Sequence, residues 1–438
     1  MKKLNILLSV LIAFSLNAQE NIKYQKPSDE ILNLVEFDRP PNVLYDDEKN
    51  YMVFLYRNNY KSISDLSEKE LRLGGLRINP KTNIGSRVTY YNNVKIKNLK
   101  DKKGQTKQVI GIPENAKLTN FSWSPDQTKI ALTNTTSEGV ELWLLTLKTG
   151  HVTKLTAPEL NANIGSAITW NTDSQLMFVK MLSPNKQPLI DTKSVVPNGP
   201  TVSTNFGAKA QNRTYQDLLK NKFDEHNFEQ LSTSTIFKVS INGESEKWLD
   251  EAMYRGISLS PDGKYVMVTQ LKKPFSYLVT YSRFPSQTDI YTNKGELVTN
   301  LLDTPLIEEL PKGRMSTRTG KRSYSWRPDQ PSTLIYVQAL DQGDPAIKIE
   351  YRDEVFEIAA PFNGEGKSLV KTINRFSGID WGTESLAIAY DYWWDTRNRK
   401  AYAFNPSNPE SKPKTIYDRN YQDVYNDPGS FLKSRNSF

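Results

Sequence analysis

Serine, histidine and acidic side chains, the usual components of a hydrolytic site, are all present, but their spacing matches no catalytic motif. A serine hydrolase needs a nucleophilic serine on a sharp turn, a histidine base and an acid that orients the base. The string closest to Gly-x-Ser-x-Gly is Gly256-Ile257-Ser258-Leu259-Ser260, which lacks the last glycine. The two histidines, His151 and His226, have no motif partner. We therefore expect no catalytic residue in this chain.

The residue types give little support for a metal site or a cofactor site. With two histidines and no cysteine, a transition-metal site is not expected. Neighbouring carboxylates such as Glu308 and Glu309 would point to opposite faces of a strand, so they are weak support for a glycosidase pair. No glycine-rich loop of the phosphate-binding type is present in the sequence. The residues predict a binding or gating module without metal or cofactor, not a complete enzyme.

A strand–turn–strand unit recurs along the chain and would position any binding residues. Its clearest copy spans Phe121–Leu132: a strand ending in Trp123, a Ser-Pro-Asp turn and a second apolar strand. Pro125 sets the backbone angle at the first central turn position, and Asp126 tolerates the next position. Four further copies follow, at Ile168–Asp173, Ile257–Gly263, Tyr324–Asp329 and Ile379–Glu384. A short unit repeated at intervals of tens of residues is typical of a repeat architecture.

The first clear copy also predicts how each unit is completed. Val140–Leu147 reads as a third strand and His151–Leu155 as a fourth, which gives four antiparallel strands in about 37 residues. A β-sandwich of similar strands would not explain why the same turn returns at the same strand pair. We therefore predict an all-β fold, a β-propeller of about six to seven four-stranded antiparallel blades with a few short helices in insertions. A further blade is predicted to begin near Asp418 and to stop there, so an incomplete ring is expected.

The region before the first clear blade predicts two short helices and a less regular blade. Apolar spacing indicates one helix within Asp29–Asp38 and another over Ile63–Leu71, with Ser64 or Asp65 as its cap. Asn42–Tyr45 and Tyr51–Tyr56 read as a strand pair. These are followed by a hairpin of Val88–Leu99 and Gln105–Ile112.

Inserts are predicted at one repeated place, between the second and third strands of a blade. The longest covers about 183–234 and contains one predicted helix around Tyr215–Lys222. Shorter inserts are expected at Lys272–Gln287, Ala339–Asp353 and Asp391–Lys400. Inserts in the same position of successive repeats fall on one end of the propeller, and such faces often serve binding. For the longest insert, a packed surface elaboration is an equally good interpretation.

The net charge and the N-terminal sequence limit which binding partners and which cellular location can be expected. The formal charge is +8, from 57 basic residues interleaved with 49 acidic ones, which is typical of a solvated surface that could still steer acidic substrates. No nucleic-acid-binding motif is present. Lys2-Lys3, the apolar run Leu4–Leu16 and Ala18 resemble a secretory signal, and no later apolar run reaches transmembrane length. The absence of cysteine excludes a lipid-anchored cysteine and fits the periplasm of a Gram-negative cell.

We therefore expect three parts in the chain. They are a signal peptide at 1–18, a lead with a short helix at 19–40, and a propeller domain at 41–438 with its long insertion. After cleavage the protein would have no membrane anchor, and it would be periplasmic or secreted.

Four strings resemble those of secreted serine peptidases of the prolyl oligopeptidase family. They are Tyr324–Asp329, Tyr351–Phe356, Ile388–Trp394 and Asp418–Tyr425. The resemblance covers nearly the whole chain after the signal. The nearest branch is that of the glutamyl-endopeptidase-like proteins of Bacteroidetes-type bacteria and chloroplasts.

The resemblance implies a propeller that restricts peptide access to a C-terminal α/β-hydrolase domain bearing a Ser-Asp-His triad. This chain departs from the family where catalysis would reside, so we expect it to be truncated before that domain and inactive alone. Cleavage after glutamate would need a cation near the substrate side chain. The candidates are Arg283, Arg314, Arg318, Arg322, Arg397 and Arg399. For each of them a surface salt bridge is the more ordinary role. A stand-alone periplasmic propeller that binds a protein or ligand is the alternative function.

Overall fold

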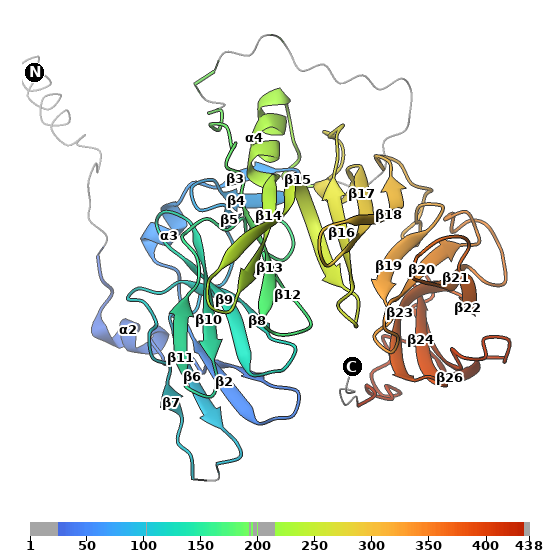
Figure 1. The fold of residues 1–438 in the computed structure, drawn as a ribbon, viewed down its shortest axis with the longest axis horizontal. Coiled ribbons are helices and arrows are strands. Elements are labelled where there is room, and N and C mark those ends of the chain that lie inside the picture. Colours follow the sequence, from blue (N-terminus) through green and yellow to red (C-terminus); the bar gives the residue numbers. More distant parts are fainter. Residues whose placement is uncertain (1–24, 102, 192–193, 196–198, 200–214, 433–438) are drawn as a thin grey trace, which may run out of the picture.

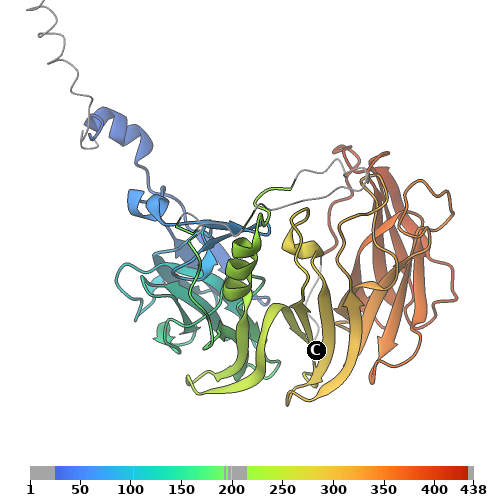
Figure 2. The ribbon, with the colours of Figure 1, turned by 90° about the horizontal axis from the view of Figure 1, so that it is seen from above.

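A computed structural model describes residues 25–101, 103–191, 194–195, 199 and 215–432. The predicted signal peptide at 1–18 lies outside these residues. Antiparallel sheets dominate, and they follow one another along the chain as six blades within the described residues. Figure 1 shows blades 1 and 2 at the left, blades 3 and 4 in the middle and blades 5 and 6 at the right, and Figure 2 shows the series as a fan seen from above. The predicted β-propeller architecture is confirmed.

Blades 1, 2, 5 and 6 are separate four-stranded sheets. Blade 1 contains β1 (Asn42–Tyr45), β2 (Tyr51–Tyr56), β6 (Asn93–Asn98) and β7 (Lys107–Gln108). Blade 2 contains β8 (Leu118–Trp123), β9 (Lys129–Thr135), β10 (Val140–Thr146) and β11 (His151–Lys154). Blade 5 contains β19 (Arg322–Trp326), β20 (Thr333–Ala339), β21 (Asp353–Ala359) and β22 (Lys367–Thr372). Blade 6 contains β23 (Arg375–Thr383), β24 (Leu386–Trp393), β25 (Asn398–Phe404) and β26 (Lys414–Asn420).

Blades 3 and 4 form one continuous seven-stranded sheet. Its strands are β12 (Ile168–Trp170), β13 (Leu176–Leu182), β14 (Ser234–Ser240), β15 (Ser245–Leu259), β16 (Tyr265–Leu271), β17 (Ser286–Thr292) and β18 (Leu297–Thr304). The long strand β15 is the outer strand of blade 3 up to Ala252, where it pairs with β14. From Met253 onward it pairs with β16 as the inner strand of blade 4. One strand therefore belongs to both blades.

The repeated turn has a specific hydrogen-bonding geometry. In blade 2, the Ser124 hydroxyl donates to Asp126 at 2.6 Å, and in blade 4 the Ser260 hydroxyl donates to Asp262 at 2.6 Å. The tryptophan before the turn connects neighbouring blades. Trp170 Nε1 donates to the Ser122 carbonyl of blade 2 at 3.0 Å, and Trp326 of blade 5 makes the same bond to Ser258 of blade 4 at 3.3 Å. The repeated residues thus close the turns of blades 2 and 4, and they dock blade 3 on blade 2 and blade 5 on blade 4.

Apolar cores lie between successive blades. The core between blades 1 and 2 includes Val53 and Ile130. The core between blades 2 and 3 includes Val140 and Val179. Three more clusters join blades 3 to 4, 4 to 5 and 5 to 6. No cluster of the described residues joins blade 6 back to blade 1. Tyr45 on blade 1 is 50% exposed. The ring is therefore open between the two terminal blades of the described part.

The inserts of blades 1, 3 and 4 lie together at one end of the propeller, although no insert was predicted for blade 1. The insert predicted at Asp391–Lys400 was wrong, because β24 runs to Trp393 and β25 begins at Asn398, which leaves only a short turn. The insert of blade 1 carries α3 (Ile63–Ser67) and a small sheet of β3 (Leu71–Leu73), β4 (Leu76–Asn79) and β5 (Ile84–Gly85). The insert of blade 3 carries α4 (Lys222–Ser232), and that of blade 4 carries the 3₁₀ turn η1 (Tyr281–Arg283). One apolar cluster, which we call the cap cluster, joins these three inserts through residues such as Ile78, Phe228 and Phe284. The described part of the long insert is therefore packed against its neighbours.

Several predicted helix and strand bounds were wrong. The helix predicted at Tyr215–Lys222 begins instead at Lys222, because the Asn221 side chain caps it by accepting from Asp224 N. The helix predicted over Ile63–Leu71 ends at Ser67. Ser62, rather than Ser64 or Asp65, is its N-cap, in a capping box with Asp65.

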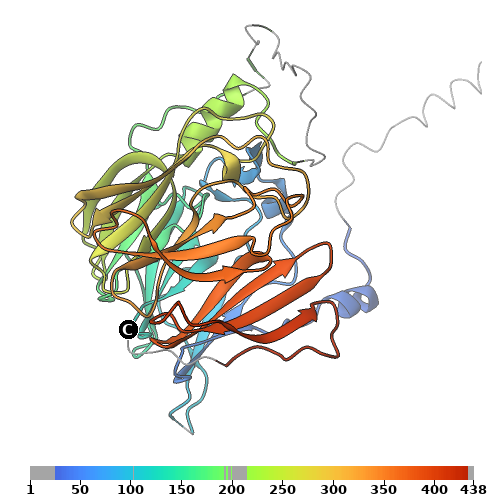
Figure 3. The same cartoon turned by 90° about the vertical axis from the view of Figure 1, so that its right-hand side faces the viewer.

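Two further elements bear on the N-terminal region. The helix α2 (Asp29–Val35) lies where it was predicted but has no buried residue. It stands apart from the sheets in Figure 2, whereas in the view of Figure 3 it projects beside the ends of the blade 6 strands. The hairpin expected of Val88–Leu99 and Gln105–Ile112 is shorter, reduced to β6 and β7. Within the described residues, the structure contains no helix with the length and apolar character needed to span a bilayer.

Candidate functional site: an arginine pocket between blades 4 and 5

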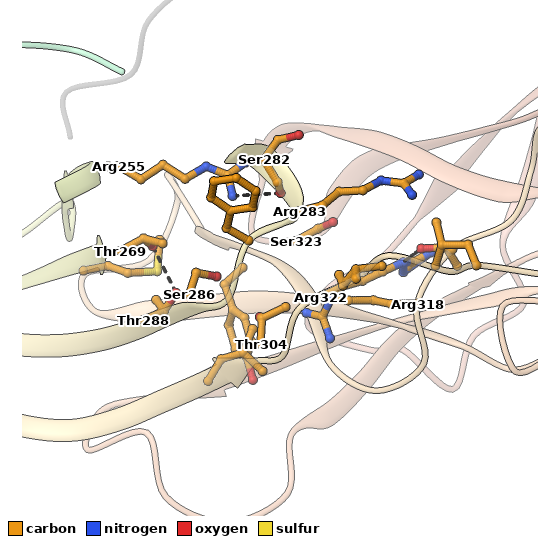
Figure 4. A pocket seen from close by; sticks show the side chains of 18 of the residues that line it. Arg255, Thr269, Ser282, Arg283, Ser286, Thr288, Thr304, Arg318, Arg322 and Ser323 are labelled. Atoms are coloured by element: carbon orange, nitrogen blue, oxygen red, sulfur yellow. Dashed lines mark hydrogen bonds between the residues drawn. The ribbon is translucent and has the colours of Figure 1, made fainter. Parts of the chain in front are cut away.

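A cavity of about 560 Å³ opens between blades 4 and 5, at the end of the blades that carries the inserts. Its walls come from the start of the blade 4 half of β15, the 3₁₀ turn η1, the ends of β16 to β18, and the start of β19. The segment 305–321, which connects blade 4 to blade 5, closes one side. Residues that are far apart in the sequence therefore meet at this point, as Figure 4 shows.

Positive and hydroxyl side chains dominate the lining of this pocket. Its arginines are Arg255, Arg283, Arg318 and Arg322. Hydroxyl groups come from Thr269, Ser282, Ser286, Thr288, Thr304, Ser316, Thr317 and Ser323. No aspartate or glutamate lines the pocket. Arginines and hydroxyls are hydrogen-bond donors, so the pocket is suited to an anionic, acceptor-rich group.

Arg322 is the most firmly positioned of the four arginines. Its Nη2 forms an ion pair with Asp353 Oδ2 at 2.5 Å, and its Nε donates to Thr317 Oγ1 at 3.1 Å. Burial lowers the pKa of Arg322, and the ion pair with Asp353 opposes that shift. Its Nη1 is buried and has no hydrogen-bond partner among the described residues. One donor of this positioned guanidinium therefore remains unpaired in the pocket wall.

The other three arginines form no salt bridge within the described part of the chain. Arg318 donates to the backbone carbonyls of Thr319 and Lys321. Burial, and secondarily the charge of Arg322, lowers the pKa of Arg318. Arg283 lies over the Tyr215 ring with its Cζ 5.4 Å from the ring centroid, and its Nη1 is buried without a partner. Arg255 Nη1 donates to the Ser282 carbonyl at 3.4 Å, the contact drawn in Figure 4.

A buried ion network behind the pocket holds Arg322 in place. Asp353 and Asp341 are both fully buried. Arg375 of β23 bridges them, with Nη1 at 3.0 Å from Asp353 and 2.7 Å from Asp341. Arg352 binds Asp341 at 2.8 Å. Two arginines thus pair with each of these aspartates. Because Arg375 belongs to blade 6 and Asp353 to blade 5, the network links both blades to Arg322 in the pocket wall.

The six arginines predicted as candidates separate into two groups. Arg283, Arg318 and Arg322 meet in the pocket. The other three lie outside it: Arg314 and Arg397 stack on Trp394, and Arg399 lies over Tyr390. Arg255 is a pocket residue that the sequence analysis missed, and nothing near it in the sequence distinguishes it from a strand residue. Its role depends on contacts between distant segments.

The residues considered for catalysis do not meet. Ser258 lies on β15, His151 begins β11 in blade 2, and His226 lies on α4. The His226 ring contacts the Pro188 carbonyl through Nε2 at 3.0 Å. No group of three His, Asp or Glu residues in the described ranges could hold a metal ion.

A second cavity, of about 830 Å³, lies between the blade 1 insert and blade 2. Its more buried charges are already paired. Lys117 binds Asp65 at 2.6 Å, and Lys154 binds Glu141 at 2.5 Å. The arginine pocket differs because most of its positive charges have no acidic partner, so it is the stronger candidate for a ligand site.

Comparison with known proteins gives two similar sequences. Both are described as probable chloroplastic glutamyl endopeptidases. The protein from Oryza sativa subsp. japonica is 34% identical, over 94% of this chain and 45% of the relative. The protein from Arabidopsis thaliana is 31% identical, over 94% of this chain and 44% of the relative. The chain thus spans about half the length of the curated relatives it matches. No protein-family model matches it. The resemblance to the chloroplast glutamyl-endopeptidase-like proteins is confirmed, and the bacterial side of that branch stays a prediction.

The solved structures that match this chain include two peptidases. An acylaminoacyl peptidase from Pyrococcus horikoshii is 14% identical with a TM-score of 0.42, over 88% of this chain and 47% of that one. The dipeptidyl peptidase 4 of Porphyromonas gingivalis is 11% identical with a TM-score of 0.44, over 87% of this chain and 53% of that one.

Proposed function

We propose that this chain is the propeller portion of a glutamyl-endopeptidase-like serine peptidase, and that its arginine pocket receives an acidic side chain of a peptide. The similarity to probable glutamyl endopeptidases over 94% of the chain supports the first part. The observation that carries the second part is the pocket itself, with four arginines and no acidic lining residue. The pocket opens at the insert end of the blades, where a peptide can approach from solvent.

A carboxylate matches the chemistry of the pocket. Arginine presents a planar fork of donors that fits the two oxygens of a carboxylate. A buried donor without a partner costs about 1–3 kcal/mol. Arg283 Nη1 and Arg322 Nη1 are two such donors. A glutamate side chain bound there would satisfy them and reduce the repulsion among the guanidinium groups.

In the whole protein, we propose that the propeller limits access of peptides to an α/β-hydrolase domain carried outside these residues. We also propose the division into a signal peptide at 1–18, a lead at 19–40 and a propeller domain at 41–438, with export to the periplasm. Mass spectrometry of the protein from a periplasmic fraction should find Gln19 at the N-terminus. A chain that retains Met1 in that fraction would contradict the export proposal.

The decisive experiment compares peptides that differ in one charge. Acetylated and amidated peptides with a single central Glu, or Gln in its place, are titrated into the purified chain by calorimetry. We expect the Glu peptide to bind at least about tenfold more tightly than the Gln peptide. Arg318→Ala and Arg322→Ala should remove the difference, whereas Arg399→Ala, outside the pocket, should keep it. Equal binding of both peptides would contradict the proposed pocket function.

A separate observation tests the peptidase assignment against a stand-alone binding module. The genomic sequence after the codon for Phe438 is read for a frame that encodes Gly-x-Ser-x-Gly. Such a frame supports the peptidase, and its absence supports the module. The pocket experiment is independent of this outcome because it measures binding, not cleavage.

A further inference from the structure

Trp394 lies in the turn between β24 and β25, and two arginine side chains contact its ring. The Cζ of Arg314 is 4.4 Å from the ring centroid, and the Cζ of Arg397 is 4.1 Å from it. The two guanidinium groups therefore lie no further apart than the sum of these distances. The Arg397 side chain is held beside the ring, because its Nη1 donates to the Trp394 carbonyl.

No acidic side chain neutralises these two arginines within the described residues. Neither forms a salt bridge, although Asp395 follows Trp394 directly in the sequence. Arg314 is exposed, and the Trp394 side chain is half-buried. A guanidinium that stacks on an indole uses its face, so its N–H edge stays free to bind a carboxylate. Two uncompensated charges with free donors are thus held on one rigid ring.

This pair lies close to the arginine pocket along the chain. Arg314 and Arg318 belong to the same connecting segment and are four residues apart. Four residues span at most about 14 Å between Cα atoms. An extended peptide covers the same distance in about four residues, so one peptide can reach both places.

From this arrangement we infer that Arg314 and Arg397 on Trp394 form a second acidic-side-chain subsite, so that the chain selects peptides with two acidic residues a few positions apart. The inference rests on the proposed function of the arginine pocket and extends it. The pocket takes the first carboxylate, and the exposed pair on Trp394 takes the second. Because the second contact is more exposed, it contributes less to affinity than the first.

The test uses blocked peptides with one Glu, or with a second Glu two to five residues away, titrated into the full chain. We expect the best-spaced peptide with two Glu to bind at least about threefold more tightly than the single-Glu peptide. Arg314→Ala and Arg397→Ala should remove that gain and leave single-Glu binding unchanged. Arg399→Ala should leave both unchanged, and raised salt should reduce the gain.

The outcomes separate this inference from the proposed function. If single-Glu peptides bind through Arg318 but a second Glu adds nothing at any spacing, the second subsite is wrong and the pocket stands. If the gain persists in Arg314→Ala and Arg397→Ala, the second carboxylate binds elsewhere and the inference is also wrong. If no Glu peptide binds better than its Gln counterpart, the proposed pocket function fails first.

Discussion

At the scale of single residues, the pocket gathers positive charge that would be unfavourable without support. Four arginines line it, and only Arg322 has a carboxylate, Asp353. Three of these arginines were candidates from the sequence, because the family resemblance pointed to the residue type. The sequence could not show which of the six would meet, since pocket membership depends on how the segment 305–321 and the blade 4 insert fold over β15 and β19.

Asp353 is expected to act as a positioning residue for Arg322. Changing Asp353 to Asn removes the charge that balances Arg322 and Arg375, and breaking such a buried pair costs about 3–5 kcal/mol. Chemical denaturation should show the loss of stability, and calorimetry should show weaker binding of the Glu peptide. Asp395→Asn, at an exposed position, should change neither quantity. Unchanged stability of Asp353→Asn would mean that the network does not restrain the pocket.

Lys180 in β13 predicts a pH-dependent stability. Its ammonium is buried and donates to the Ile164 carbonyl, and burial lowers its pKa to about 7. In the unfolded chain the lysine pKa is about 10.4, so between these pH values the unfolded state binds the extra proton. Stability should therefore rise with pH across this window, by up to about 1.4 kcal/mol per pH unit from this group. Below pH 7 the full cost of burying the charge is present.

Lys180→Met isolates this effect. The variant should be more stable than the natural protein at pH 7, and the difference should shrink as pH rises to 9, because the other titrating groups are shared. Denaturant unfolding at pH 6, 7, 8 and 9 measures it. Lys414→Met, at an exposed strand position, serves as the control. A difference that stays constant over this range would show that Lys180 does not change its protonation there.

At the scale of elements, the inserts are held by aromatic packing. Phe228 of α4 is fully buried, with ring centroids 5.1 Å from Phe275 and 5.6 Å from Phe284. Phe284 also lines the arginine pocket. The cap cluster thus connects the long insert to the proposed binding site through one layer of side chains.

Truncating Phe228 tests that connection. Phe228→Ala should cost about 3–5 kcal/mol, because it removes a buried ring and leaves a cavity. Unfolding monitored by denaturant measures the cost, and titration with the Glu peptide reports whether Phe284 and Arg283 keep their positions. Phe37→Ala, at a residue that is 57% exposed, is the matched control and should be close to neutral. A loss as small as that of the control would mean that the cap cluster is not tightly packed.

Local signals predicted strands and turns better than helix ends or contacts between inserts. The Ser-Pro-Asp turns and the strands beside them follow from residue type and alternation, and they lie where expected. The start of α4 was missed because Asn221 and not an earlier residue caps the helix. The cap cluster was also not predicted, since its members come from the inserts of blades 1, 3 and 4, and sequence periodicity within one insert does not reveal its partner.

At the scale of the whole molecule, six blades form an open series in the described part of the chain. The sheets of blades 2 to 5 each share an apolar core with two neighbours, while the sheets of blades 1 and 6 each share one, although the blade 1 insert is also held in the cap cluster. In repeat proteins, stability is roughly the sum of the units and the contacts between neighbours. The two end blades are therefore the least supported.

Hydrogen exchange should reveal this difference. Amides of β24 and β25 in blade 6, and of β2 in blade 1, are expected to exchange faster than those of β9 and β13 at the same pH. The reason is that local opening of an end blade disrupts a single interface. Exchange measured by mass spectrometry on peptide fragments gives the comparison. Equal protection in all six blades would indicate that blades 1 and 6 contact each other in solution.

The long strand β15 also decides where the polypeptide can be divided. Elsewhere the blades are connected by loops, such as 305–321, and no strand continues through such a loop from one sheet into the next. A break in such a loop leaves both neighbouring sheets whole, so two co-expressed fragments divided there can reassemble. A break near Ala252 would cut β15 itself, and it would separate the half that is the outer strand of blade 3 from the half that is the inner strand of blade 4. Blades 3 and 4 must therefore be inherited, exchanged or engineered together as a single module.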